Sequence, residues 1–221
     1  MNTRKKSLPP QVSARLPRYY RVLRGMIGED KLRTSSGELA RRMLLTPSQV
    51  RQDFSYLGGV GTQGYGYNVN ALYNEISAIL GLDKQYKMVI MGAGNLGQAI
   101  VNYTYYYKTG FMVCGVFEVN PRLIGIKIND IDVMDYENTV EYVEENNIDI
   151  GIICTTKENA QEVADRLCFA GIKGIWNFAP VDLEVPSHVA LENVQLSESL
   201  HSLAYHINGA NAEKEDGDDN K

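Results

Sequence analysis

The residues whose spacing points most directly to chemistry are three glycines in the stretch VIMGAGNLGQAI. Gly92, Gly94 and Gly97 form a G-x-G-x-x-G pattern that follows an apolar run and opens a helical segment. In that context the first glycine permits a tight turn, the second lets the backbone approach a pyrophosphate, and the third lets the helix pack on the strand. The free N–H groups at the start of the helix then favour phosphate. We therefore predict a dinucleotide site whose contacts include Gly92, Ala93, Gly94, Asn95, Leu96 and Gly97.

A carboxylate follows at the distance that such a site requires. The apolar run MVCGVF ends at Glu118, 21 residues beyond Gly97. A carboxylate at this position can accept hydrogen bonds from both hydroxyls of the adenosine ribose and would repel a 2′-phosphate, which favours NAD(H) over NADP(H). Because Arg122 lies close to Glu118 in the sequence, NADP(H) remains an alternative ligand. A tight glycine turn that binds no ligand is the structural alternative.

A parallel sheet is needed to bring these residues together. In the second half of the chain, apolar runs that predict strands alternate with amphipathic segments that predict helices. Such alternation predicts an α/β fold in which helices cover both faces of a parallel sheet. We expect this Rossmann-type domain to span residues 83–196. The predicted strands are 87–91, 112–117, 149–154 and 173–178, and the clearest helix is 158–170.

The first 80 residues carry a different pattern, that of short helices. Apolar residues recur at helical spacing from Leu16 through Tyr20 to Ile27 and predict a first helix. An S-x-x-E capping box at Ser35 begins a second helix. Thr46 then suits the N-cap of a third helix over residues 47–57, with a proline at its first position. The last two helices predict a helix-turn-helix in which 47–57 is the recognition helix.

The recognition helix would turn Val50, Phe54 and Leu57 inward and its polar side chains outward. The stretch GGVGTQGYGY that follows alternates glycines with residues suited to a short β-ribbon, and it predicts a wing over residues 58–67. An exposed recognition helix beside a wing can read DNA. The predicted DNA contacts are Ser48, Gln49, Arg51, Gln52, Ser55, Tyr56, Gly61, Gln63 and Gly64.

The distribution of charge supports this interpretation. The chain of 221 residues has a net charge of −5, but residues 1–80 hold 12 Lys and Arg against 5 Asp and Glu, whereas residues 81–221 hold 10 against 22. A basic segment joined to an acidic one is typical of a protein whose basic part faces a polyanion. We therefore expect the N-terminal domain, residues 1–82, to bind double-stranded DNA. A three-helix module that binds another protein is the alternative.

Composition and residue spacing argue against a membrane protein, a secreted protein and a metal-binding protein. No apolar run approaches the ~20 residues of a membrane span, and the basic start MNTRKKSLPP lacks the apolar core of a signal peptide, so we expect a cytoplasmic protein without a membrane partner. The three cysteines and three histidines show no metal-ligand spacing, so no metal is predicted. No catalytic residue is predicted either, because the sheet and its helices leave no room for a substrate domain. An NAD-dependent enzyme with an accessory helix-turn-helix stays open as an alternative.

Six segments together resemble the Rex family of bacterial redox-sensing transcriptional repressors, over about Leu16 to Ile207. The resemblance implies a homodimer that binds a palindromic operator with TTGTG-type half-sites and releases it when NADH is bound. Two recognition helices must meet successive major grooves, so a rigid-body rotation is enough to break binding. The segments are RLPRYYRVL, VRQDFSYLG, GYGYNV, MGAGNLGQAI, DRLCFAGIKGIWNFAPVDLEVP and SLHSLAYHI.

The resemblance also implies roles for single residues. Glu118 matches the carboxylate that binds ribose, and Tyr103 and Thr155 match positions beside the nicotinamide. Arg15, Tyr103 and Gln195 stand at the positions of the redox switch, with Arg15 at the end of a basic arm that we expect to be flexible. The apolar stripe of the last helix, residues 197–208, would be exchanged between the two subunits. The acidic tail, residues 209–221, is expected to be disordered.

Several residues depart from the family's pattern. Gln52 and Gln63 stand where basic residues are usual, so we expect weaker and less salt-dependent DNA binding and a different operator sequence. Gln195 replaces an aspartate and cannot form an ion pair with Arg15, and CTTKE at 154–158 replaces a TVPA-like turn. Because of these differences, an alternative is that the protein is a diverged paralogue. Such a paralogue would bind DNA but respond to another adenine nucleotide or to no ligand.

Overall fold

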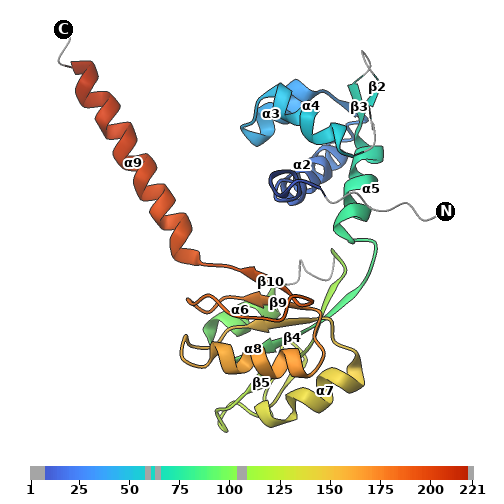
Figure 1. Cartoon of the computed structure of the whole chain (residues 1–221), viewed down its shortest axis with the longest axis vertical. Helices are drawn as coiled ribbons and strands as arrows, with labels where there is room; N and C mark the ends of the chain where they lie inside the picture. Colours follow the sequence, from blue (N-terminus) through green and yellow to red (C-terminus); the bar gives the residue numbers. More distant parts are fainter. Residues whose placement is uncertain (1–7, 58–60, 63–65, 104–108, 219–221) are drawn as a thin grey trace. The chain divides into compact units, whose positions relative to one another are not determined.

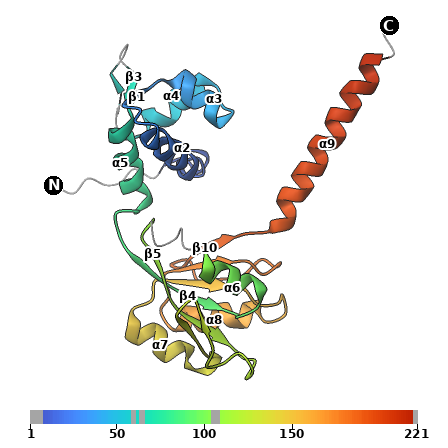
Figure 2. The ribbon, with the colours of Figure 1, turned by 180° about the vertical axis from the view of Figure 1, so that it is seen from behind.

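The structure is a computed structural model in which the chain divides into two compact units, between Lys84 and Gln85. The sequence predicts this boundary between residues 82 and 83. Figure 1 follows the elements of both units along the chain, and Figure 2 shows them from behind. For residues 61–62 and 209–218 only the backbone is described. The structure describes residues 8–57, 61–62, 66–103 and 109–218.

Helices packed on a common apolar core form most of the N-terminal unit. The buried face of the first long helix passes through Tyr19 and Met26, whereas Tyr20 and Ile27, which the sequence pattern suggests, are only partly buried. The arm that we expected to be flexible contains a short helix with a buried Val12, so the prediction is wrong for that segment. The helices are α1 (Pro10–Ser13), α2 (Leu16–Gly28), α3 (Ser36–Met43), α4 (Pro47–Ser55) and α5 (Val69–Leu80).

The turn between α3 and α4 is held by caps at both of its ends. Leu44 closes α3 in the left-handed conformation, with φ of 53°. The Thr46 hydroxyl accepts a hydrogen bond from Gln49 N, and the Gln49 side-chain oxygen accepts one from Thr46 N, which completes a capping box at the start of α4. Val50 and Phe54 of α4 lie in the core, as the sequence predicts.

A small antiparallel sheet completes this unit. Its strand order is β1-β3-β2. The β2–β3 hairpin is the predicted wing, and β1 is a third strand that the sequence pattern did not indicate. Gly66 has φ of 71°, and a Cβ there would lie 2.5 Å from the carbonyl oxygen of Thr34, so the close pairing of β3 with β1 requires glycine. The strands are β1 (Arg33–Thr34), β2 (Gly61–Thr62) and β3 (Gly66–Asn68).

The C-terminal unit is built on a sheet with the order β10-β9-β8-β4-β5-β7-β6. All of these pairs are parallel except β6 with β7. Numbered from β4, the parallel strands follow the 3-2-1-4-5-6 order of a dinucleotide-binding fold, and the order reverses between β4 and β8. The strands are β4 (Tyr86–Met91), β5 (Phe111–Glu118), β6 (Lys127–Ile128), β7 (Ile131–Asp135), β8 (Ile150–Ile153), β9 (Gly174–Asn177) and β10 (Ala190–Asn193).

Helices cover both faces of this sheet, as Figure 1 shows. Val89 and Met91 of β4 pack with α7 and α8, whereas Met88 and Ile90 point to the other face and pack with α6. The expected α/β architecture is therefore confirmed. The helices of this unit are α6 (Asn95–Asn102), the short 3-10 helix η2 (Tyr136–Asn138), α7 (Thr139–Asn146), α8 (Ala160–Phe169) and α9 (Leu196–Asp218).

The last helix is longer than the sequence predicts. Helix α9 runs through residue 208 and ends at Asp218, so the segment that we expected to be disordered continues the helix over most of its length. Ala, Glu and Lys in NAEKE are strong helix formers, which offsets the low apolar content of this segment. Among the described residues, no helix combines the length and apolar character of a membrane span.

Candidate functional site

The glycine turn lies where three parallel strands end. Gly92 N donates a hydrogen bond to the carbonyl oxygen of Phe117 at 2.8 Å, and Cys154 N donates one to Met91 at 2.9 Å. Gly92 has φ of 109°, and a Cβ there would lie 2.7 Å from the carbonyl oxygen of Cys154. A side chain at Gly97 would collide with the carbonyl oxygen of Gly92. Both glycines are therefore required by the close approach of backbone segments.

Gly94 differs from its two neighbours in the motif. It is the N-cap of α6 in an extended conformation, and a Cβ built on it meets no atom within 4 Å. Its lack of a side chain is therefore not explained by packing within the protein. Asn95 and Leu96 form the first turn of α6, where free N–H groups and the helix dipole favour an anion. This turn fits the approach of a pyrophosphate.

Glu118 ends β5 beside the glycine turn. One carboxylate oxygen accepts a hydrogen bond from Ala93 N at 2.7 Å, and the other accepts bonds from Val119 N at 2.9 Å and Asn120 N at 3.0 Å. Three backbone donors thus fix the carboxylate in place. The structure therefore places Glu118 beside the glycine turn, although Glu118 and Gly97 are 21 residues apart in the sequence.

A cleft of about 160 Å³ opens at this edge of the sheet. It lies outside the carboxyl ends of β4, β5 and β8, where the strand order reverses and where folds of this kind bind dinucleotides. Thr155, which the resemblance places beside the nicotinamide, lies in the turn after β8 and lines this cleft. The lining residues are Met91, Gly92, Phe117, Glu118, Val119, Tyr136, Thr155, Asn159, Glu162 and Val163.

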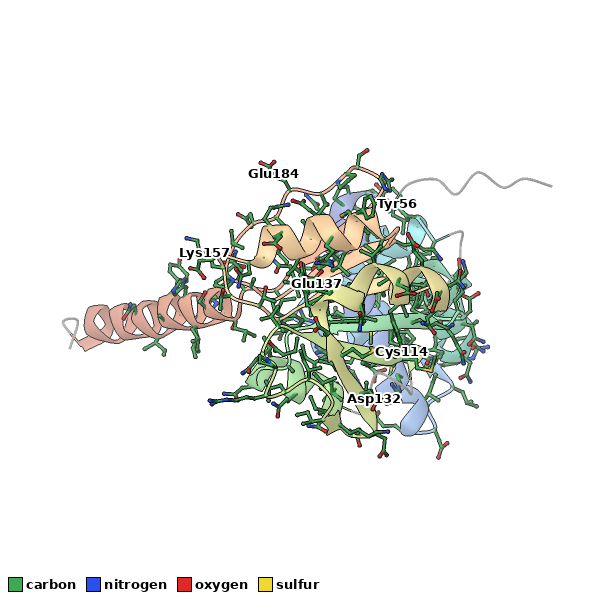
Figure 3. All side chains as sticks on the ribbon, turned by 90° about the horizontal axis from the view of Figure 1, so that it is seen from below. Tyr56, Cys114, Asp132, Glu137, Lys157 and Glu184 are labelled. Atoms are coloured by element: carbon green, nitrogen blue, oxygen red, sulfur yellow. The ribbon has the colours of Figure 1, made fainter. Side chains whose placement is uncertain are left out.

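One wall of the cleft has a support that the sequence did not indicate. The Arg166 guanidinium of α8 lies 4.3 Å from the centre of the Tyr136 ring, within the range of a cation–π contact. Arg166 Nη2 also donates to the Glu137 carboxylate at 2.7 Å, and the hydrogen bond raises the pKa of the guanidinium. Figure 3 labels Glu137 on the short helix η2. The Tyr136 ring in the wall of the cleft is thus in contact with a guanidinium that Glu137 holds by an ion pair.

Tyr103 and Gln195, which the resemblance assigns to the redox switch, are not among the residues that line this cleft. Tyr103 follows the last residue of α6, at the opposite end of that helix from the glycine turn, and its side chain is exposed. Gln195 lies between β10 and α9 and is half-buried. Cys154 lies near the cleft, but burial raises the pKa of its thiol to about 12, so it is uncharged at neutral pH.

The exposed face of α4 carries the predicted DNA-reading residues. Arg51 donates to the hydroxyls of Ser48 at 3.0 Å and Ser36 at 3.3 Å, so its guanidinium is held above the start of the helix. Gln49 uses its side-chain oxygen in the capping box, and the Ser55 hydroxyl donates to the carbonyl oxygen of Gln52 at 2.7 Å. These residues share one exposed face with Tyr56, which is labelled in Figure 3.

The predicted wing contacts are described only in part. Gly61 lies in β2, and its pairing with Tyr67 places it at the wing. Gln63 and Gly64 lie outside the residues that the structure describes. Their contribution to DNA contact therefore stays a prediction.

Arg15, which we expected in a flexible arm, is held by the recognition helix. Its Nε and Nη2 atoms donate to the two carboxylate oxygens of Asp53 at 2.8 and 2.6 Å. The Tyr19 hydroxyl donates to the same carboxylate at 2.9 Å. Sequence reasoning assigned no role to Asp53, although it falls on the apolar face of α4 beside Val50 and Phe54. An acidic residue on the apolar face of a predicted helix was the sequence signal from which a role for Asp53 could have been inferred.

Comparisons with known proteins match both units. A family described as "Putative DNA-binding protein N-terminus" matches residues 7–55, and one described as "CoA binding domain" matches residues 83–181. A redox-sensing transcriptional repressor Rex from Thermoanaerobacter pseudethanolicus is 54% identical over 93% of this chain and 92% of its own length. The Rex protein of Clostridium novyi is 50% identical over 94% of this chain and 99% of its own length.

Solved structures agree with the sequence relatives. The crystal structure of RSP, a Rex-family repressor, matches with a TM-score of 0.88 and 51% identity, over 95% of this chain and 98% of that chain. RSP has also been solved in complex with β-NAD⁺ and operator DNA, and with β-NADH, at the same TM-score and identity. The agreement in sequence and fold extends over both units, and the chain belongs to the Rex family of redox-sensing transcriptional repressors.

Proposed function

We propose that this protein represses transcription by binding operator DNA through its N-terminal unit, and that NADH bound in the C-terminal unit releases the operator. The observation that carries the proposal is the pairing, in one chain, of an exposed recognition helix with a glycine turn in which Gly92 lines the cleft and a side chain at the exposed Gly94 would meet no protein atom. RSP supports it, since that relative has been solved with NAD⁺ and operator DNA together, and with NADH.

NAD(H) is the ligand class that the cleft fits best. The Glu118 carboxylate is held by three N–H groups at the position where a ribose carboxylate is required. A 2′-phosphate there would meet a fixed negative charge, and Glu162 adds a second carboxyl group to the lining. We therefore propose that NADH binds more tightly than NADPH. Titration of the purified protein with each nucleotide, followed by nucleotide fluorescence, tests this, and equal affinities would contradict it.

DNA binding is assigned to α4 and the wing. Arg51 is exposed at the centre of the polar face of α4, and a guanidinium is the commonest reader of guanine and of phosphate. We expect Arg51→Ala to weaken binding to a palindromic duplex with TTGTG-type half-sites, measured by fluorescence anisotropy. Lys127→Ala changes an exposed cation of the other unit that does not line the cleft, and it serves as the matched control for DNA binding. Unchanged operator affinity of the Arg51 variant would contradict the assignment.

A homodimer is part of the proposal. On α9, Leu196, Leu200, Leu203 and Ile207 are more than half exposed and recur at helical spacing, so the single chain leaves an apolar stripe in contact with water. The same unit has an apolar cleft of about 440 Å³ that includes Ile150, Trp176 and Leu191. We propose that a second copy covers these surfaces, with α9 exchanged between the subunits.

We propose a regulatory rather than a catalytic role for the nucleotide site. The relatives are transcriptional repressors. Within the described lining of the cleft, the ionisable groups are Glu118, Tyr136 and Glu162, so no histidine or lysine is placed there as an acid or base. We propose that the nucleotide acts as a signal and is released chemically unchanged. Steady oxidation of NADH with a small-molecule acceptor would contradict this.

A further inference from the structure

Asp53 is a buried carboxylate on a helix whose other polar side chains face solvent. Its side chain is 2% exposed, and it lies in α4 between residues of the apolar core. Both of its oxygens are used, since Arg15 binds them in a bidentate pair and Tyr19 donates to Oδ2. Burial and the hydrogen bond to Asp53 raise the pKa of the Tyr19 hydroxyl, so Tyr19 stays a hydrogen-bond donor at physiological pH. The recognition helix is thereby joined to the start of α2.

We propose that Asp53 is a positioning residue for operator recognition: through Arg15 and Tyr19 it fixes the rotation of α4, and so the direction in which the base-reading side chains point. This inference rests on the proposed DNA binding by α4. Neither Asp53 nor Tyr19 contacts DNA in it, because both are buried.

The apolar contacts of α4 cannot supply this constraint alone. Val50, Phe54 and Leu57 bind the helix to the core, but hydrophobic contact is not directional and tolerates small rotations. A bidentate arginine–carboxylate pair has a fixed planar geometry and adds orientational specificity. On a helix of nine residues, a small rotation moves every exposed side chain.

Stability is a poorer explanation of this cluster. Removing a carboxylate from water is costly, and buried ion pairs are often no more stabilising than apolar residues of the same shape. Their best attested use is to specify one geometry among several. A polar cleft of about 130 Å³ lies between α1 and α4, and Arg15 and Asp53 line it together with Gln49, Gln52 and Tyr56. The ion pair is therefore directly beside the predicted DNA-reading face.

The test separates orientation from folding. Asp53→Asn keeps the shape and removes the charge, and the triple variant Arg15→Met, Tyr19→Phe, Asp53→Leu replaces the whole cluster with apolar side chains that leave no buried polar group unpaired. Glu29→Gln is the matched control, since Glu29 forms a bidentate pair with Arg42 at 2.7 and 2.8 Å on the surface of the same unit. Affinity is measured for the palindromic duplex and for a scrambled duplex of equal length.

The readout is the ratio of the two affinities, because partial unfolding lowers both equally and leaves their ratio unchanged. We expect the ratio to fall at least about fivefold in both Asp53 variants, which is the discrimination of one good base contact, and to stay at the wild-type value in Glu29→Gln. A wild-type ratio in either Asp53 variant would overturn the inference. If the wild-type protein itself does not distinguish the two duplexes, the proposed function fails instead.

Discussion

At the scale of single residues, the glycine motif separates into positions that the fold requires and one that it does not. Side chains at Gly92 and Gly97 would meet backbone atoms of neighbouring segments. At Gly94 a methyl group would meet no protein atom, and its φ of −68° suits alanine. We propose that the missing side chain at Gly94 leaves room for the nucleotide, and this residue gives the cleanest test of the proposed nucleotide site.

Gly94→Ala is expected to leave the thermal unfolding midpoint close to that of the wild type while lowering NADH affinity by an order of magnitude or more. The reason is that the added methyl group occupies the space through which a pyrophosphate approaches the backbone. Isothermal calorimetry and thermal unfolding measure the two effects. Gly97→Ala is the contrasting variant, because its collision with Gly92 should lower the unfolding midpoint. Wild-type NADH affinity in Gly94→Ala would show that the nucleotide does not use this turn.

At the scale of elements, the recognition helix depends on a capping box that also occupies one of its predicted DNA contacts. Gln49 bonds back to Thr46 N through its side-chain oxygen. Its side-chain nitrogen is on the same amide and is held in a fixed direction by that bond. The cap therefore contributes both to the stability of α4 and to the placement of a polar group on the exposed face.

Thr46→Ala is expected to lower the free energy of unfolding by about 1 kcal/mol, the usual effect of losing an N-cap side chain. Urea unfolding followed by far-UV circular dichroism measures this. The backbone N–H at residue 46 can still donate to Gln49 in this variant, but the Thr46 hydroxyl, which donates to the same side-chain oxygen at 3.1 Å, is lost. Gln49 is then held less firmly, so operator affinity should also fall. Ser35→Ala removes the corresponding cap of α3, where the hydroxyl accepts from Glu38 N at 3.2 Å, and should cost similar stability with a smaller effect on DNA. Equal effects of the two variants on DNA affinity would contradict a special role of the α4 cap.

At the scale of the whole molecule, the exposed stripe of α9 requires a covering surface. We expect the full chain to sediment as a dimer, with twice the chain mass of 24.7 kDa. A chain that ends at Gln195 should sediment as a monomer or dissociate at much lower concentration, because it loses the apolar side chains from Leu196 onward. Analytical ultracentrifugation over a range of concentrations checks this. A full chain that sediments as a monomer would contradict the proposed homodimer.

The sequence predicted the architecture because its signals are local. Glycine spacing, apolar runs and caps indicated the dinucleotide turn, the long strands and the recognition helix. It missed β10, whose ALEN segment is mostly exposed, and the β6–β7 pair, whose strands are short or alternate with acids. It also missed the partner of Arg15, because Asp53 is 38 residues away and their contact depends on tertiary packing. The helix in the acidic tail was missed because the low apolar content of this segment indicates disorder, although its Ala, Glu and Lys residues favour helix.

The central claim is the coupling of nucleotide binding to DNA release. The most direct measurement is the affinity of the full chain for the palindromic duplex at fixed salt, without nucleotide, with saturating NAD⁺ and with saturating NADH. The account predicts that NADH lowers the affinity by about 5- to 150-fold, the usual range of allosteric coupling, and that NAD⁺ does not. By reciprocity the duplex should weaken NADH binding by the same factor. Equal DNA affinity in all three conditions would contradict the claim and favour a paralogue that responds to another ligand or to none.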